Sequence, residues 1–220
     1  MFDSKSALAL QQSLLKAGFN PGTPDGQWGK NSQAALDASL AKYDIAWSGK
    51  VSPEFTQKTK DICDKLKSPV GSPNWLMSCM AFETGRTFSP TIKNGAGAPY
   101  YGLVQFGKLA LQDIGVSLPS LLAMTAEQQL DCVYAFFKPY AGRLQDLPSF
   151  YMRILWPAGV DKPDTYVLWD KADSKRAVAY TQNRGLDINN DGQINRGEVS
   201  RVIWNMYAEG MRIENRRLLS

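Results

Sequence analysis

Apolar residues recur three or four positions apart along most of the chain, which is the spacing of an amphipathic helix. The stretch 6–18 carries such a stripe and ends at Gly18, a residue that commonly stops helices. A second helix is predicted from an N-cap at Asn31, and a third from an N-cap at Ser52 with Pro53 in its first position. The stripe of the third helix is Phe55, Thr59, Ile62 and Leu66. This pattern predicts a mainly α fold.

Two segments rich in proline and glycine interrupt the helical pattern in the first third of the chain. Residues 19–29, FNPGTPDGQWG, predict a turn-rich loop. Residues 67–74, KSPVGSPN, have the composition of a linker. We therefore predict a small helical module over residues 1–66, a linker over 67–74 and a larger domain over 75–220.

An apolar stretch at the end of this linker leads to a single carboxylate. Ser72 and Pro73 predict the start of a helix that reaches Glu83, with Gly85 as its stop. Helical spacing places Glu83 on one face with the apolar residues Leu76, Cys79 and Met80. Partial burial raises the pKa of a carboxyl, which suits a general acid at neutral pH. The alternative is a glutamate at a helix end that turns to solvent.

The amino-acid composition excludes several kinds of catalytic and metal site. The chain has 220 residues, a formal net charge of +4 and no histidine. The absence of histidine excludes Ser-His-Asp and Cys-His nucleophile systems and His-ligated zinc. The three cysteines, Cys63, Cys79 and Cys132, lack metal-ligand spacing and are predicted to be free and buried.

Charge and hydropathy also limit which kinds of partner we expect. The chain has no basic stripe with interleaved aromatic residues, so we expect no nucleic-acid partner. No apolar run reaches the roughly 20 residues that span a bilayer, so we expect no stable membrane insertion. Asp3, Gln11 and Gln12 make the first residues unlike a signal peptide, and we expect the chain to fold in a cytoplasm.

The loop at 19–29 and its flanks carry a family pattern. A helix, then Gly-Phe-x-Pro-Gly-x-x-Asp-Gly-x-Trp-Gly, then a second helix with Ala-Leu resembles the three-helix peptidoglycan-binding domain of many cell-wall hydrolases. The likeness ends after Leu36, where the usual Phe-Gln is missing. It implies peptidoglycan as a partner and Asp25, Gly26 and Trp28 as residues of the module's site. The alternative is that these residues only build the turn.

A second resemblance begins at Glu83. ETGRTFSP and YYGLVQF are similar to the paired motifs of lysozyme-like lytic transglycosylases, with one extra residue between the glutamate and the proline. The resemblance implies Glu83 as the catalytic acid and Thr84 as a supporting hydroxyl. The substrate-binding residues that it implies are Tyr100, Tyr101, Gly102, Gln105, Phe106 and Tyr151. The structural alternatives are a capping amide for Gln105, a tight turn for Gly102 and core packing for the aromatic residues.

Together the two resemblances imply a modular bacteriophage endolysin with a lysozyme-like catalytic domain. Such an enzyme cleaves the β-1,4 bond between N-acetylmuramic acid and N-acetylglucosamine with one glutamate and no cofactor for catalysis. A hydrolytic muramidase or chitinase-like enzyme on the same fold stays open, with Asp113, Glu127 and Asp131 as candidate bases. A non-catalytic wall-binding or virion structural protein is the alternative of another class.

The endolysin resemblance also implies a setting. We expect a monomer that waits in the cytoplasm of the host bacterium, is released with the help of a holin and acts on the cell wall in the periplasm.

Residues 187–198, DINNDGQINRGE, fit the EF-hand calcium loop. Its ligands would be Asp187, Asn189, Asp191, Gln193 through its carbonyl, and Glu198. The pattern predicts a structural calcium site, and an Asx-rich turn that caps a helix is the alternative. Helices are expected over about 174–182 and 198–217. The basic end of the second, with Arg212, Arg216 and Arg217, is expected to be solvated or to contact an anionic outer-membrane surface.

Overall fold

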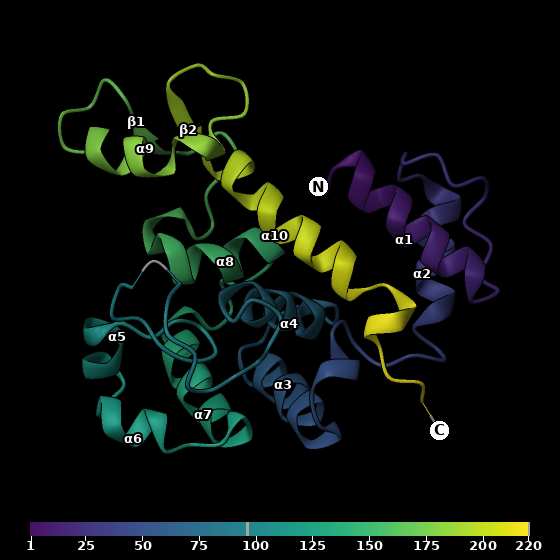
Figure 1. Cartoon of the computed structure of the whole chain (residues 1–220), viewed down its shortest axis with the longest axis horizontal. Coiled ribbons are helices and arrows are strands. Elements are labelled where there is room, and N and C mark those ends of the chain that lie inside the picture. Colours follow the sequence, from purple (N-terminus) through teal and green to yellow (C-terminus); the bar gives the residue numbers. More distant parts are fainter. Residues whose placement is uncertain (96, 220) are drawn as a thin grey trace.

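The computed structural model describes residues 1–95 and 97–219, and these form a mainly helical fold with a two-stranded sheet (Figure 1). The α-helices are α1 (Ser4–Lys16), α2 (Lys30–Ser39), α3 (Pro53–Lys65), α4 (Ser72–Glu83), α5 (Lys108–Asp113), α6 (Leu118–Leu122), α7 (Ala126–Phe137), α8 (Leu147–Leu155), α9 (Ala177–Asn183) and α10 (Arg196–Gly210). The short 3-10 turns are η1 (Ser48–Lys50), η2 (Lys138–Tyr140), η3 (Pro157–Gly159), η4 (Arg184–Leu186) and η5 (Ile213–Asn215). Strands β1 (Val167–Asp170) and β2 (Gln193–Asn195) pair antiparallel. The predicted mainly α class is confirmed.

Helix α3 begins as its sequence predicts. The Ser52 hydroxyl accepts a hydrogen bond from the backbone N–H of Phe55, and Pro53 is the first helical residue. This arrangement satisfies one of the free donors at the start of the helix. The predicted apolar stripe is buried over its full length: Phe55, Thr59, Ile62 and Leu66.

Two predicted helix starts are wrong by a residue or two. The N-cap of α2 is Gly29, whose extended backbone leads into the helix, so Asn31 lies in the first turn and caps nothing. Helix α4 contains Ser72 and follows Gly71, with no side-chain cap. Ser72 is fully buried, which indicates that packing rather than a capping hydroxyl sets this helix start.

Helix α4 lies at the centre of the fold and contacts α3, α8 and α10 (Figure 1). Most of its side chains are buried, on every face of the helix, and the list runs Ser72, Pro73, Asn74, Leu76, Met77, Ser78, Cys79, Met80 and Ala81. A helix that is apolar all round is typical of a protein core. Its last residue, Glu83, is the point at which this core helix meets partly solvated surroundings.

Helix α10 runs diagonally across the molecule and connects its parts (Figure 1). It contacts α4 and α8 along its length, α1 near the N-terminus of the chain, and β2 at its own start. Close approach to the segment before α3 depends on Gly210, because a Cβ there would lie 2.2 Å from the indole nitrogen of Trp47. Residues from distant parts of the sequence therefore share one hydrophobic core, from Leu10 to Met211.

Helix α3 packs against α4 and α7, while α1 packs against α2 and α10. The predicted linker is a short connection, because α3 ends at Lys65 and α4 already begins at Ser72. The third helix of the predicted module is thus part of the same packing as the helices of the predicted catalytic domain. The division into residues 1–66 and 75–220 stays a prediction.

The C-terminal helices differ from their predicted bounds. Helix α9 begins at Ala177, three residues later than expected, and α10 spans Arg196–Gly210 instead of 198–217. A capping box fixes the earlier start of α10, since Asn195 and Glu198 exchange side-chain and backbone hydrogen bonds. Beyond Gly210 the chain leaves the helix and pairs with residues 42–44.

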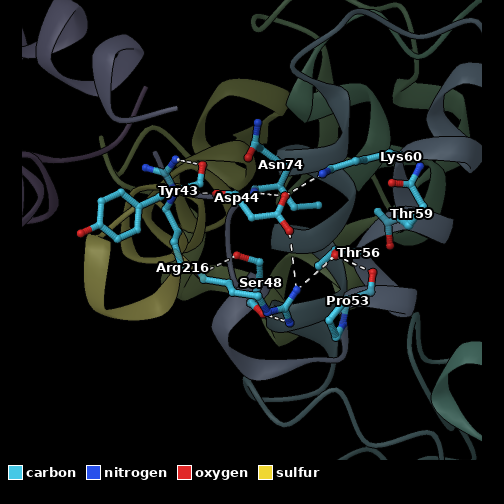
Figure 2. Close-up of polar contacts among 12 residues, drawn as sticks. Tyr43, Asp44, Ser48, Pro53, Thr56, Thr59, Lys60, Asn74 and Arg216 are labelled. Carbon is cyan, nitrogen blue, oxygen red and sulfur yellow. Dashed lines mark hydrogen bonds and ion pairs between the residues drawn. The ribbon is translucent and has the colours of Figure 1, made fainter. Parts of the chain in front are cut away.

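The expectation of a solvated or membrane-facing basic end is wrong for Arg216. This side chain is 5% exposed. Its guanidinium donates to the backbone oxygens of Asp44 and Tyr43, both at 2.7 Å, and to the hydroxyl of Ser39 at 2.6 Å. Figure 2 shows this guanidinium beside Tyr43 and the carboxylate of Asp44 reaching Lys60 on α3. The cation serves to satisfy buried carbonyl groups.

We expect Arg216→Ala to lower the free energy of unfolding by about 3–5 kcal/mol, because it leaves buried carbonyls without a donor. Urea denaturation measures the loss. The matched control is Arg201→Ala on exposed Arg201 of α10, which should change stability by less than about 0.5 kcal/mol. Equal stabilities of the two variants would contradict the structural role of Arg216.

Candidate functional site

Glu83 is the last residue of α4, and the chain reverses directly after it. The backbone N–H of Gly85 donates to the oxygen of Phe82, and that of Arg86 donates to the oxygen of Ala81. Gly85 has a φ of 57°, in the left-handed region that glycine tolerates. This is a Schellman ending, and it confirms Gly85 as the helix stop. It leaves the Glu83 side chain at the edge of the core.

Thr84 supports this turn through backbone contacts. Its side chain is fully buried, and its hydroxyl donates to the oxygen of Met80 at 2.7 Å. The same hydroxyl accepts a hydrogen bond from the backbone N–H of Phe88 at 3.0 Å. Phe88 packs against the rings of Trp47 and Phe55. The predicted supporting role of Thr84 is therefore structural: it ties the loop after Glu83 to the end of α4.

The surroundings of Glu83 raise the pKa of its carboxyl. The three apolar residues predicted on its face, Leu76, Cys79 and Met80, are all fully buried. No hydrogen bond or ion pair joins the Glu83 carboxyl to any residue that the structure describes. Burial alone raises its pKa to about 8. The side chain is still partly exposed, so the carboxyl is mainly protonated at neutral pH and open to solvent.

Tyr151 lies next to this carboxyl, on α8. Burial raises the pKa of the Tyr151 hydroxyl, and the charge of Glu83 raises it further. Its ring meets Phe82 edge-on, with 5.5 Å between ring centroids. Tyr151 is 5% exposed. The structure thus brings together Glu83 and Tyr151, which stand far apart in the sequence, and holds the tyrosine ring against the neighbour of the acid.

The segment that carries the second motif folds back on itself. Tyr101 forms backbone bridges with Lys93 and with Phe106. The following Gly102 is buried with a φ of 78°, and a Cβ there would lie 2.3 Å from the amide oxygen of Gln129. Gly102 is therefore required for the approach of Gln129. This favours the tight-turn alternative, and the substrate-binding role of the glycine stays a prediction.

Gln129 on α7 holds this segment in place. Its amide oxygen accepts from the backbone N–H of Leu103 at 2.7 Å, and its amide nitrogen donates to the oxygens of Pro90 at 2.9 Å and Leu121 at 3.3 Å. A fully buried amide that satisfies three backbone groups fixes loops that have no regular structure of their own.

Gln105 keeps a free acceptor. It has a φ of 53°, and its amide nitrogen donates to the oxygen of Gly102 at 3.2 Å and to that of Ile92 at 3.4 Å. Its amide oxygen is buried and has no hydrogen-bond partner among the described residues. Part of the role is thus the capping amide of the alternative interpretation. The buried oxygen therefore has an unmet hydrogen-bonding capacity.

The aromatic residues of the motif differ in exposure. Phe106 is 1% exposed and packs edge-on against Phe136, which favours the core-packing alternative, and its contact with substrate stays a prediction. Tyr100 is 46% exposed and its ring lies over Gly107. Tyr101 is half-buried and lines an apolar cavity of about 340 Å³. Tyr100 and Tyr101 are the aromatic residues of this motif that reach the surface.

Three non-glycine residues of the two predicted motifs have a left-handed backbone. Arg86, Phe88 and Gln105 all have positive φ, between 52° and 72°. Non-glycine residues adopt this region at a cost and are enriched at functional sites. Arg86 is held there by two hydrogen bonds from its guanidinium to the carboxylate of Glu209 on α10, at 2.6 and 2.7 Å.

The candidate hydrolytic bases have other partners. Glu127 accepts a hydrogen bond from the Ser52 hydroxyl, which lowers the pKa of its carboxyl. Asp131 forms an ion pair with Lys58 on α3 at 2.8 Å. Asp113 is exposed at the end of α5. None of the three is joined to Glu83 by a described contact.

The loop between α1 and α2 is organised by Gln11, which is 1% exposed. Its amide oxygen accepts from the backbone N–H groups of Asp25 and Gly26, and its nitrogen donates to Ser32. A Cβ on Gly26 would lie 2.7 Å from a backbone oxygen of α1, so this glycine builds the turn. Asp25 and Trp28 line a cavity of about 440 Å³. The Trp28 ring packs edge-on against Phe2.

The predicted calcium loop has α9 and η4 on one side and α10 on the other, and it contributes strand β2 to the sheet. Asp187 is 7% exposed, and hydrogen bonds from Tyr180 first and also from Gly192 lower the pKa of its carboxyl. Glu198 accepts from the backbone N–H groups of Ile188 and Asn195. Across residues 1–95 and 97–219, no three His, Cys, Asp or Glu side chains form a ready-made metal cage.

Some features lie away from Glu83. A cavity of about 630 Å³ lies between α1 and residues 212–214, without Glu83 in its lining. We place the chemistry at Glu83 instead, because burial raises the pKa of that carboxyl. Cys63, Cys79 and Cys132 are free and buried, as predicted.

Comparison with known proteins does not assign the chain to a family. A scan against models of protein families found no match, and a search of curated proteins found no similar sequence. In the described part of the chain, no helix has both the length and the apolar character needed to cross a membrane.

Three contributors to the site were missed by the sequence interpretation: Gln129, Gln11 and the Arg86–Glu209 pair. The roles of the two glutamines could have been predicted from the sequence, because each stands on the apolar face of its own helix. A buried polar residue on such a face needs partners. The sequence offers no pattern that predicts the Arg86–Glu209 ion pair, since its members are 123 positions apart.

The raised pKa of Glu83 predicts how stability depends on pH. Between pH 4.5, the ordinary value, and about pH 8, the folded protein keeps a proton at Glu83 that the unfolded chain has released. Stability therefore falls as pH rises through this window. Relative to Glu83→Gln, the wild type should lose on the order of 4 kcal/mol of unfolding free energy between these two pH values.

Urea denaturation at a series of pH values measures this difference. The control is Glu54→Gln, which changes an exposed glutamate of α3 and should run parallel to the wild type. Parallel curves for Glu83→Gln and the wild type would mean that the Glu83 carboxyl is well solvated.

Proposed function

We propose that this protein is a cell-wall-degrading enzyme of the endolysin type, which cleaves the glycan strands of peptidoglycan with Glu83 as its acid. The observation that carries the proposal is a glutamate at a core helix end, protonated at neutral pH by burial alone and still open to solvent. A carboxyl with a pKa near 8 can donate a proton to a leaving sugar oxygen at working pH. The motif resemblance selects the glycan strand as the substrate.

The proposed reaction needs one carboxyl group. Glu83 gives its proton to the glycosidic oxygen as the bond to the anomeric carbon breaks, and positive charge develops on the muramic ring. The resulting carboxylate stabilises that charge. It then takes the proton from the C6 hydroxyl as the oxygen of this hydroxyl bonds to the anomeric carbon, which yields a 1,6-anhydro end. No metal or organic cofactor takes part in these steps.

The surroundings of Glu83 suit these roles. The candidate second carboxylates Glu127 and Asp131 are engaged with Ser52 and Lys58. This favours internal attack over attack by a water that needs its own base. We assign the unpartnered amide oxygen of Gln105 to a sugar hydroxyl or N-acetyl N–H, and the exposed ring of Tyr100 to stacking on a sugar face.

The remaining parts of the proposal concern location and binding. We propose that the loop cavity beside Asp25 and Trp28 holds peptidoglycan, so that the enzyme stays on the wall between cuts. The net charge of +4 favours an anionic wall. A monomer made in the host cytoplasm, released with a holin and active in the periplasm fits this function.

Replacement of the acid is the direct test of the proposal. We expect Glu83→Gln to lower lysis of permeabilised Gram-negative cells by about 100-fold or more, because the amide cannot donate the required proton. Turbidity measures lysis, and binding to isolated walls should be unchanged. Glu54→Gln should lyse normally. Full lysis by Glu83→Gln would place the acid elsewhere, and inactivity of the wild type would favour a non-catalytic wall binder.

The products decide between the two chemistries. Mass spectrometry of digested walls should find 1,6-anhydromuramic ends, at a mass lower than the hydrolysis product by one water. Reducing ends alone would mean that water attacks, and would make the protein a hydrolytic muramidase on the same acid.

The binding module makes a separate prediction. We expect Trp28→Ala to weaken retention on isolated walls by about 10-fold, since it removes an aromatic surface from the loop cavity. Cleavage of soluble glycan fragments should be unchanged, and circular dichroism checks the fold. Loss of soluble activity without loss of wall retention would reverse the assignment of this loop.

A further inference from the structure

The loop at 187–198 takes no part in the proposed chemistry, yet several of its side chains bond to its own backbone. The backbone N–H of Gly192 donates to Asp187 at 3.1 Å, closing the loop. The N–H of Asp191 donates to Asn189 at 3.0 Å, and that of Gln193 to Asp191 at 2.8 Å. These bonds join the side chains of the first, third and fifth loop positions to the loop's own backbone, and an EF-hand takes calcium ligands from the same three positions.

One carboxylate oxygen of Asp187 lacks a hydrogen-bond donor. Its side chain is 7% exposed, and its Oδ2 accepts from the Tyr180 hydroxyl at 2.7 Å and from the Gly192 N–H. Its Oδ1 is buried with no hydrogen-bond partner among the described residues. A buried carboxylate oxygen without a donor is costly. A cation within the loop would satisfy it.

EF-hand loops usually pair with a second EF-hand loop through a short strand. Here strand β1 pairs with the loop instead. Ile194, at the eighth loop position, is fully buried and pairs with Trp169 of β1. The Gln193 side chain donates to Asp170 at 2.9 Å. Strand β1 thus supports the loop as a partner loop would. Helices α9 and α10 flank it on the two sides.

We propose that residues 187–198 form a structural calcium site. The ligands would be the carboxylates of Asp187, Asp191 and Glu198, the Asn189 amide oxygen and the backbone oxygen of Gln193. Without the ion, the described structure does not gather the three carboxylates into one cage, and both oxygens of Asp191 accept hydrogen bonds within the loop. Three carboxylates and two neutral oxygens suit Ca²⁺, which accepts many oxygen ligands in a flexible geometry, better than Mg²⁺. To bind, Glu198 exchanges its hydrogen bonds from Ile188 and Asn195 for the ion.

The site lies where it can fix the start of α10. Next to Glu198, Arg196 is 3% exposed and pairs with Asp146 at 2.7 Å and with Asp164 at 2.8 Å. Asp146 caps α8, the helix of Tyr151. Calcium would therefore hold α10 and α8 together at the end of the molecule opposite the C-terminal tail (Figure 1).

Terbium luminescence tests the site directly, because Tb³⁺ replaces Ca²⁺ and Tyr180 lies beside Asp187 as a sensitiser. After removal of calcium with a chelator, Tb³⁺ should give tyrosine-excited emission that Ca²⁺ displaces and equal Mg²⁺ does not. Calcium at about 100 times its dissociation constant should raise the melting temperature by roughly 5–10 °C. Absence of both effects in the wild type would overturn the proposal.

Two variants make the test specific. Glu198→Gln and Asp187→Asn keep the side-chain shape and should weaken calcium binding by about 10-fold or more, as the ligand charge falls. Asp173→Asn changes a nearby half-buried acid outside the loop, which pairs with Arg176, and this variant should bind calcium like the wild type. Circular dichroism without calcium checks that each variant folds. Equal affinity in all four proteins would mean adventitious binding to the acidic surface and would also overturn the proposal.

Discussion

Burial of α4 on all its faces is the constraint on which the rest of the structure depends. Its apolar residues make it the central helix, with α3, α8 and α10 packed around it. Because the helix is in the core, whatever stands at its last position is held at a fixed place on the core's edge. That residue is Glu83, so the packing that stabilises the fold also sets the pKa of its carboxyl. The cost of shielding this acid is met by the many apolar contacts of the same helix.

Helix α10 extends this constraint over the whole molecule. It contacts α4, begins in the loop at 187–198, and leads into a tail whose Arg216 binds buried backbone oxygens before α3. The two ends of the chain are thereby fixed to the helix that carries Glu83. Helix α10 thus links Arg216 and the loop at 187–198 to the helix that carries Glu83. The packing of α3 on α4 and α7 has the same effect, since it joins the predicted binding module to the core.

Local patterns were enough to predict part of this arrangement. The start of α3, its buried stripe, the end of α4 and the shielded face of Glu83 all follow from spacing and capping. The surroundings of three residues could not be predicted, because each depends on a partner distant in sequence. Gly102 contacts Gln129, Phe106 packs on Phe136, and Arg216 donates to Asp44. A glycine that follows two tyrosines can allow the approach either of a ligand or of a buried amide side chain. Only the folded chain shows which group occupies the space.

The pairing of Arg86 explains how Glu83 stays neutral. Arg86 stands three residues after Glu83, and a free guanidinium there would favour the carboxylate and lower its pKa. Both hydrogen bonds from Arg86 go instead to Glu209, and burial is the cause that raises the pKa of Glu83. The left-handed backbone at Arg86, following Gly85, directs its side chain to α10. The turn that ends α4 therefore does two things: it exposes the acid at the edge of the core, and it gives the nearest cation in sequence another partner.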